Sequence, residues 1–214
     1  MSGITIIGGS GFAGAHIAEA AAVRGLEVTS LSRHEVAEQI GGVRYRAGSI
    51  LDPADRARVL AESETVIVAV SPRGDMAGQV RQAISVFAAE AAESAVRLCV
   101  VGGAGSLQRP DGAGLVKDAP DFPADYLPEA EEMTGVLDDL RSTPESLDWI
   151  LVSPAAVFGA AAPGEYRGEY RIGGDVLLVD ETGVSAISGA DFGVALIDEI
   201  ENPAHHRERI TFAY

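Results

Sequence analysis

The sequence has little cysteine and few basic residues, and it has no apolar run long enough to cross a membrane. Cys99 is the only cysteine, so an intramolecular disulfide is excluded and a cytoplasmic location is expected. Lysine and arginine number 16 against 32 acidic residues, and the formal net charge is −16. Such a surface repels nucleic acids and anionic membranes, so we expect neither as a partner. The N-terminus shows no basic segment or cleavage signal, so no leader peptide is expected.

The chain contains enough apolar residues for a full core, 47% of 214. Short β-branched runs alternate with helical patterns, which predicts an α/β fold with a Rossmann-type, doubly wound parallel sheet. The expected strands are 4–7, 26–31, 43–47, 65–70, 97–102, 148–153 and 208–213. The expected helices are 12–24, 34–40, 53–61, 75–95, 128–142 and 190–201. No linker or repeat interrupts residues 1–214, so we expect one nucleotide-binding domain.

Two segments break this alternation. Residues 103–127 are rich in Gly, Pro and Asp and are expected to form a long loop. Residues 155–189 begin with Ala, Pro and Gly and show alternating strand character at 166–172 and 176–179. Both segments follow expected strands at their carboxyl ends, where open α/β sheets bind ligands. We therefore expect 155–189 to be a small C-terminal insert on the substrate side, with both segments as pocket walls.

A glycine turn joins the first strand to the first helix. It contains Gly8, Gly11 and Gly14, with Ser10 and Phe12 between them. In a dinucleotide-binding turn, the first glycine allows the tight bend and the second lets the backbone approach a pyrophosphate. The third lets the helix pack on the strand. The alternative is an ordinary glycine-rich connection, but the flanking strand and helix favour a nicotinamide dinucleotide.

The end of the second strand predicts which dinucleotide is bound. An NAD site usually has an acidic residue there, whereas this chain has Ser32 and Arg33. A guanidinium can hold a 2′-phosphate through two hydrogen bonds, so NADPH is the expected cofactor and NADH is the alternative. In the alternative, Arg33 is a solvated residue that pairs with Glu35.

Further cofactor contacts are expected after the fourth and fifth strands. Small residues there would let the cofactor cross the sheet edge, and a second glycine cluster follows where the nicotinamide and an acceptor would meet. These residues are Ala69, Val70, Ser71, Gly102 and Gly103.

The chain resembles the atypical short-chain dehydrogenase/reductase group, in particular NAD(P)H-binding NADH-flavin reductases related to biliverdin reductase B and the NmrA-like proteins. The matching blocks are residues 7–14, 100–107, 152–156, 168–175 and 187–192. The resemblance implies a cofactor contact at Pro154. It also implies one at Ser49 and Ile50, although relatives commonly carry Gly-Asp where this chain has Gly48-Ser49.

The chain departs from ordinary short-chain dehydrogenases in its chemistry. Those enzymes use a Tyr-x-x-x-Lys pair, but Lys117 is the only lysine here and Ala130 lies four residues after Tyr126. The expected reaction is therefore direct hydride transfer from NADPH to a flavin or similar planar acceptor, with the flavin as substrate and not as a bound group. An NmrA-type redox sensor and an epimerase or isomerase are the alternatives.

The acceptor pocket has several candidates, none of which is assigned a proton-transfer role. They are Ser106, Tyr126, Ser153, Phe158, Tyr166 and Tyr170. No metal site is expected, because His205 and His206 are adjacent and lack the spacing of a preformed site. The expected partner is a small-molecule acceptor, and the protein is expected to be a monomer or homodimer.

Overall fold

The computed structural model describes residues 3–214, in which eight strands form one sheet. The strands are β1 (Gly3–Ile7), β2 (Glu27–Ser32), β3 (Val43–Ala47), β4 (Thr65–Val68), β5 (Arg97–Val101), β6 (Trp149–Ser153), β7 (Arg171–Gly173) and β8 (Glu208–Ala213). Their order is β3-β2-β1-β4-β5-β6-β8-β7, and only the β7–β8 pair is antiparallel. This is the doubly wound, Rossmann-type α/β fold that the sequence predicts.

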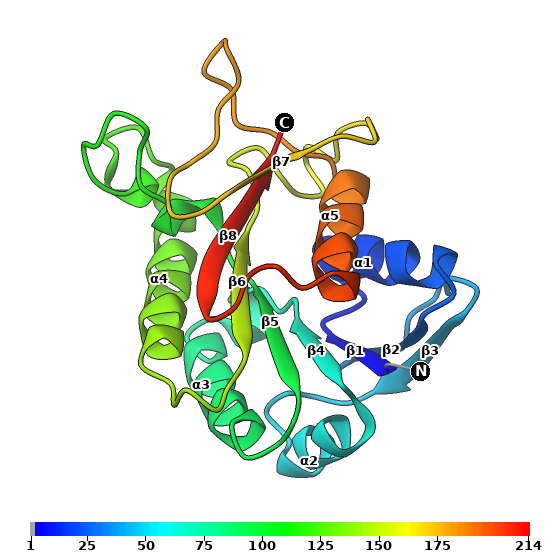
Figure 1. Cartoon of the computed structure of the whole chain (residues 1–214). Helices are drawn as coiled ribbons and strands as arrows, with labels where there is room; N and C mark the ends of the chain where they lie inside the picture. The colour runs from blue at the N-terminus through cyan, green and yellow to red at the C-terminus, as the bar shows by residue number, and fades with distance from the viewer. Residues whose placement is uncertain (1–2) are drawn as a thin grey trace.

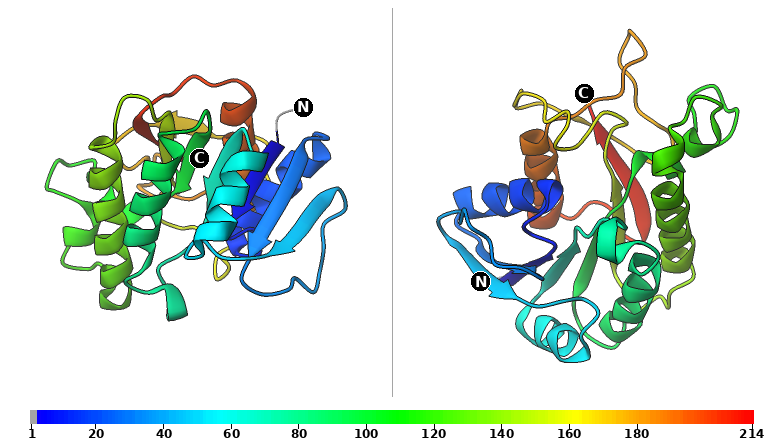
Figure 2. Two further views of the ribbon diagram at one scale, coloured as in Figure 1. Left: turned by 90° about the horizontal axis from the view of Figure 1, so that it is seen from below. Right: turned by 180° about the vertical axis from the view of Figure 1, so that it is seen from behind.

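Five α-helices cover the two faces of the sheet (Figures 1 and 2). They are α1 (Phe12–Val23), α2 (Pro53–Glu62), α3 (Val80–Ala91), α4 (Leu127–Arg141) and α5 (Gly189–Glu201). One core lies between the sheet and α1 and α5, and the other lies under α2, α3 and α4. Cys99 and Trp149 are fully buried, one in each core.

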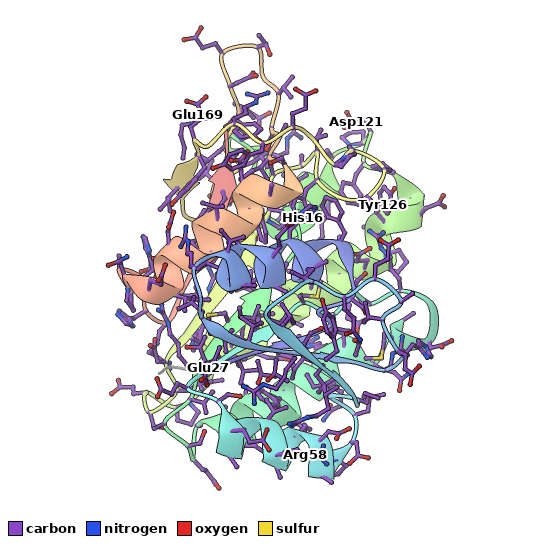
Figure 3. All side chains as sticks on the ribbon, turned by 90° about the vertical axis from the view of Figure 1, so that its right-hand side faces the viewer. His16, Glu27, Arg58, Asp121, Tyr126 and Glu169 are labelled. Carbon is purple, nitrogen blue, oxygen red and sulfur yellow. The ribbon has the colours of Figure 1, made fainter. Side chains whose placement is uncertain are left out.

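Small residues bring α1 and α5 close together. A Cβ on Gly193 would lie 2.5 Å from the carbonyl oxygen of His16, and one on Gly189 would lie 2.1 Å from the His16 ring. Figure 3 shows His16 where the two helices meet. This contact explains why glycine stands at both positions of α5, and it fixes the start of α5 beside the start of α1.

The expected helix at 34–40 is wrong, because these residues form a loop. Only Val36 and Ile40 are half-buried there, so the segment has no continuous apolar face to pack on the sheet. The helix expected at 75–95 is shorter, because the positive φ angle of Gly78 interrupts its first turn and α3 begins only at Val80. In the insert, only β7 forms a regular strand.

The parallel arrangement places one set of loops at one edge of the sheet. The residues after β1 to β6 all lie at the carboxyl edge, and α1, α4 and α5 begin there. The long segments 102–126 and 154–188 lie above this edge at the top of Figure 1. Among residues 3–214, no helix combines the length and the apolar character needed to cross a membrane.

Candidate functional site

The glycine turn after β1 is tight, and two of its glycines contact backbone. Gly8 has a φ of 89°, and a Cβ there would lie 2.6 Å from the carbonyl oxygen of Ala69. A Cβ on Gly14 would lie 2.3 Å from the carbonyl oxygen of Gly8. Neither contact can relax by a side-chain movement, so the turn needs glycine at both positions for its own geometry.

The start of α1 is open to solvent next to this turn. Ser10 and Gly11 are exposed, and Gly11 is the N-cap residue without a side chain to cap the helix. The first turn of α1, which the structure describes completely, carries no acidic residue. The uncapped N–H groups and the positive end of the helix dipole therefore face an uncovered space, and this suits an anionic pyrophosphate. The turn thus fits a dinucleotide.

Arg33 lies just beyond β2, and its neighbour is not Glu35, the partner named in the alternative interpretation. Its guanidinium is 3.8 Å from the carboxylate of Asp75, with side-chain exposures of 39% and 87%. Glu35 forms no ion pair with it in the described part of the chain. Ser32 is buried beside Arg33, and its carbonyl accepts a hydrogen bond from Gly48 N–H. Arg33 is therefore a half-exposed cation at the β2 end of this edge, with an acidic neighbour.

The loop after β3 is held by its own hydrogen bonds. Ser49 N–H donates to Asp55 over 2.9 Å, and Leu51 N–H donates to the Ser49 hydroxyl over 3.1 Å. Ile50 is buried in the core under α2 and α3. The Ser49 hydroxyl keeps its own proton for a further hydrogen bond, whereas Ile50 acts mainly as a core residue in this loop.

The middle of the edge is formed by residues after β4, β5 and β6. Ala69 N–H donates to the Ile7 carbonyl and Val70 packs beside Gly8, so this loop lies against the glycine turn. Gly102 packs on Leu151, but no atom lies within 4 Å of the position that a Cβ on Gly103 would take. The backbone at Gly103 therefore borders open space. The remaining candidates here are Ser71, which donates weakly to Glu129, and Pro154, which is buried.

An aromatic cluster joins the insert to the glycine turn. The ring of Phe158 lies 5.2 Å from Phe12, the first residue of α1, and 4.7 Å from Phe192 in α5. Of the candidate pocket residues, Phe158 thus lies next to the expected cofactor turn. Ser153 is fully buried at the end of β6, and its hydroxyl has no hydrogen-bond partner among the described residues.

Tyr126 lies at the start of α4 and is 51% exposed. The guanidinium of Arg73 lies 5.3 Å from its ring centre, and Arg73 also pairs with Glu129. One turn further along α4, Ala130 packs on Gly105, where a Cβ would come within 2.7 Å of the Ala130 methyl group. The place that a lysine would take in a Tyr-x-x-x-Lys pair is therefore a close contact between small residues.

Tyr170 lies on a different part of the molecule from Tyr126. Its hydroxyl donates to Asp198 near the end of α5, and burial together with Asp198 raises the pKa of Tyr170 to about 12. Figure 3 shows the neighbouring Glu169 and Tyr126 on opposite sides of the molecule. Tyr166 is exposed and makes no side-chain hydrogen bond to the described residues. The structure thus brings Phe158, but not Tyr170, next to the turn.

Ser106 is held by an arginine that the sequence analysis missed. The guanidinium of Arg209 in β8 donates to the Ser106 carbonyl over 2.8 Å and to its hydroxyl over 3.0 Å. It also binds Asp175, which follows β7. The available signal was an arginine within the strand expected at 208–213, because a charge that is buried in a sheet needs a partner.

Comparisons with known proteins agree with this geometry. Residues 8–200 match the family described as NAD(P)H-binding. The protein YwnB of Bacillus subtilis is 37% identical over 215 residues, which cover 97% of this chain and 96% of YwnB.

Two solved structures have the same fold over the whole chain. One, from Bacteroides thetaiotaomicron, is named as a candidate epimerase; it is 31% identical, covers 100% of this chain and 97% of its own, and has a TM-score of 0.86. The other, from Streptococcus pneumoniae, is named as a candidate NADH-flavin reductase; it is 30% identical, covers 100% and 99%, and has a TM-score of 0.79. The chain therefore belongs to the NAD(P)H-binding family.

Proposed function

We propose that the protein is an NADPH-dependent reductase of a flavin or a similar planar acceptor. The observation that carries this proposal is the exposed start of α1 beside the glycine turn, where the Phe158 ring lies 5.2 Å from Phe12; the backbone at Gly103, after β5, also borders open space. An aromatic ring and an open glycine backbone suit a flat ring system, which binds by stacking and close approach.

The chemistry needs little from the protein beyond binding and orientation. NADPH supplies a hydride to the electron-poor acceptor ring, and solvent supplies the proton. Ala130 packs on Gly105 where a relay lysine would stand, so the residues present fit a reaction without that relay. Orientation of two rings by the turn after β5 and the insert is then the main contribution to rate. The proposal includes a small-molecule acceptor, a cytoplasmic location and a monomer or homodimer.

The direct test is oxidation of NADPH and of NADH by the purified protein with FMN, FAD, riboflavin and small quinones. We expect acceptor-dependent loss of nicotinamide absorbance, faster with NADPH. If calorimetry shows NADPH binding but no acceptor is reduced, the reductase proposal is wrong. That result favours the alternative, a redox sensor that binds the dinucleotide without transferring its hydride.

Arg33 is expected to select NADPH. Replacing Arg33 by alanine should weaken NADPH binding by about 1–3 kcal/mol, as expected for charge-assisted hydrogen bonds to a phosphate, and leave NADH binding nearly unchanged. Asp75→Asn is the matched variant, because it removes the acidic neighbour 3.8 Å from Arg33 and should strengthen NADPH binding slightly. Calorimetry with both cofactors measures these changes. Equal losses for NADPH and NADH in Arg33→Ala would assign Arg33 a structural role.

Tyr126 is expected not to act as an acid. Its phenol is exposed beside Arg73, and no lysine follows on α4, so Tyr126→Phe should retain most NADPH oxidation activity. Loss of a general acid typically lowers a rate by roughly 10²–10⁴-fold. Steady-state rates with FMN, measured together with NADPH affinity, separate the two cases. A fall of that size with unchanged NADPH affinity would contradict direct hydride transfer without a protein acid.

A further inference from the structure

The turn after β5 is tied to the rest of the molecule by Arg209. This side chain is 3% exposed, and one nitrogen, Nη1, donates to both oxygen atoms of Ser106. Nε donates to the Asp175 carboxylate over 2.8 Å, and Nη2 donates to the Asp175 carbonyl over 3.2 Å. A planar guanidinium thus joins two loops that are far apart in sequence, with its donors directed in a fixed fork.

The backbone of the same two loops is also joined. Gln108 N–H donates to the Asp175 carbonyl, and Leu177 N–H donates to the Gln108 carbonyl. Arg209 lies beneath this junction on the face of β8 that packs toward α4, opposite Leu151 in register. Loss of the guanidinium would therefore release the turn at Ser106 and the loop at Asp175 together.

Burial of the Arg209 guanidinium costs free energy, and an apolar side chain that only filled this space would not have that cost. Burial lowers the pKa of Arg209, while Asp175 opposes that change. An apolar side chain of similar size could fill the same volume, since buried ion pairs add little stability over such residues. What an apolar residue could not supply is the directional link between the two loops.

We propose that Arg209 is a positioning residue, which fixes the 102–106 turn so that the acceptor lies correctly on the open backbone at Gly103. This inference rests on the proposed function, in which that turn is the acceptor side of the site. Arg209 does not border the glycine turn at Gly8 to Gly14, so cofactor binding should not depend on it.

Arg141 offers a matched control. It binds the same Asp175 carboxylate over 2.9 Å, but it is half-exposed and makes no hydrogen bond to Ser106. Arg141→Met therefore removes a charge from the same cluster without releasing the turn. Arg209→Lys keeps the charge but loses the fork, so it should fold even if Arg209→Met does not.

The experiment compares wild type, Arg209→Met, Arg209→Lys and Arg141→Met by amide hydrogen exchange, NADPH calorimetry and steady-state reduction of FMN. In both Arg209 variants, exchange at residues 104–108 and 175–177 should be about tenfold faster, because a charge-assisted anchor is lost. The kcat/KM for FMN should fall about tenfold or more, because misplacement of a reactant is costly, while NADPH affinity stays within about twofold. Arg141→Met should change none of these readouts.

Several results would overturn the inference. They are unchanged exchange in the two loops, the same change in Arg141→Met, or a loss of NADPH affinity that matches the loss of FMN reduction. If the wild-type protein reduces no acceptor, the proposed function fails by itself. The exchange pattern and NADPH affinity then still show whether Arg209 holds the turn locally.

Discussion

Replacement of Gly11 by valine is expected to abolish NADPH binding while the protein stays folded. Gly11 has φ −75° and ψ 168°, which a β-branched residue adopts easily. A Cβ there would lie 3.3 Å from the Gly8 carbonyl oxygen, so a shift of a few tenths of an ångström accommodates it. The added side chain would instead occupy the space over the turn that a pyrophosphate needs. If the valine side chain prevents two N–H groups of the turn from binding the pyrophosphate, NADPH binding becomes weaker by about 100-fold or more.

Gly14→Ala is the control for this prediction. Its Cβ would lie 2.3 Å from the Gly8 carbonyl oxygen, so the substitution should lower the melting temperature as well as the NADPH affinity. Calorimetry and thermal unfolding of both variants separate the two effects. If Gly11→Val binds NADPH as tightly as wild type, the 8–14 turn is not the phosphate site.

Local patterns in the sequence were sufficient to predict the glycine turn and most of the sheet. Gly14 packs on the backbone of its own turn, and Gly8 packs on the residue that follows β4. The buried parallel strands appear in the sequence as continuous β-branched runs. The N-terminal half of the edge was therefore predictable. The loop at 34–40 could not be predicted in this way. Its residues have helix propensity, but they offer no apolar face that could pack on the sheet.

Contacts between distant segments could not be predicted in the same way. Arg209 meets Ser106 across 103 residues of sequence, and the Tyr170 hydroxyl meets Asp198 on α5. No repeat in the sequence predicts such pairs, because their contact depends on how the chain is arranged around β7 and β8. A charged residue inside a buried strand could signal that a partner exists, but the partner itself becomes visible only in the fold.

Arg97 illustrates the same kind of contact at the opposite end of the sheet, and its replacement should have the largest effect on stability. Arg97 is the first residue of β5, and its buried guanidinium donates to Glu199 over 2.9 Å and to the His205 carbonyl over 2.7 Å. Glu199 is also buried and lies 2.8 Å from the His205 ring. Arg97→Met should lower the free energy of unfolding by about 3–5 kcal/mol, because it removes the arginine from a buried ion pair and leaves Glu199 with only His205 and backbone N–H groups as partners. Urea unfolding measures this change, and NADPH affinity should not change, because Arg97 lies at the amino end of β5.

The pH dependence of stability shows whether Arg97→Met destabilises the protein by breaking the ion pair with Glu199 or by a loss of packing. Burial raises the pKa of Glu199, but hydrogen bonds from His205 and Arg97 outweigh it and hold the pKa below 4.5. The stabilisation by this pair is therefore present above pH 4.5 and is lost as the pH falls through the folded-state pKa.

Asp148, which lies 3.4 Å from Arg97, and His206, which contacts Asp148, are further ionisable groups at this cluster. In Arg97→Met, protonation of Glu199 removes the buried negative charge that has lost Arg97, so the difference in unfolding free energy from wild type should narrow on acidification. Arg46→Met, which breaks an exposed pair with Glu62, should cost only about 0–1 kcal/mol. A gap that stays constant from neutral to acidic pH would show that the loss is one of packing and not of charge.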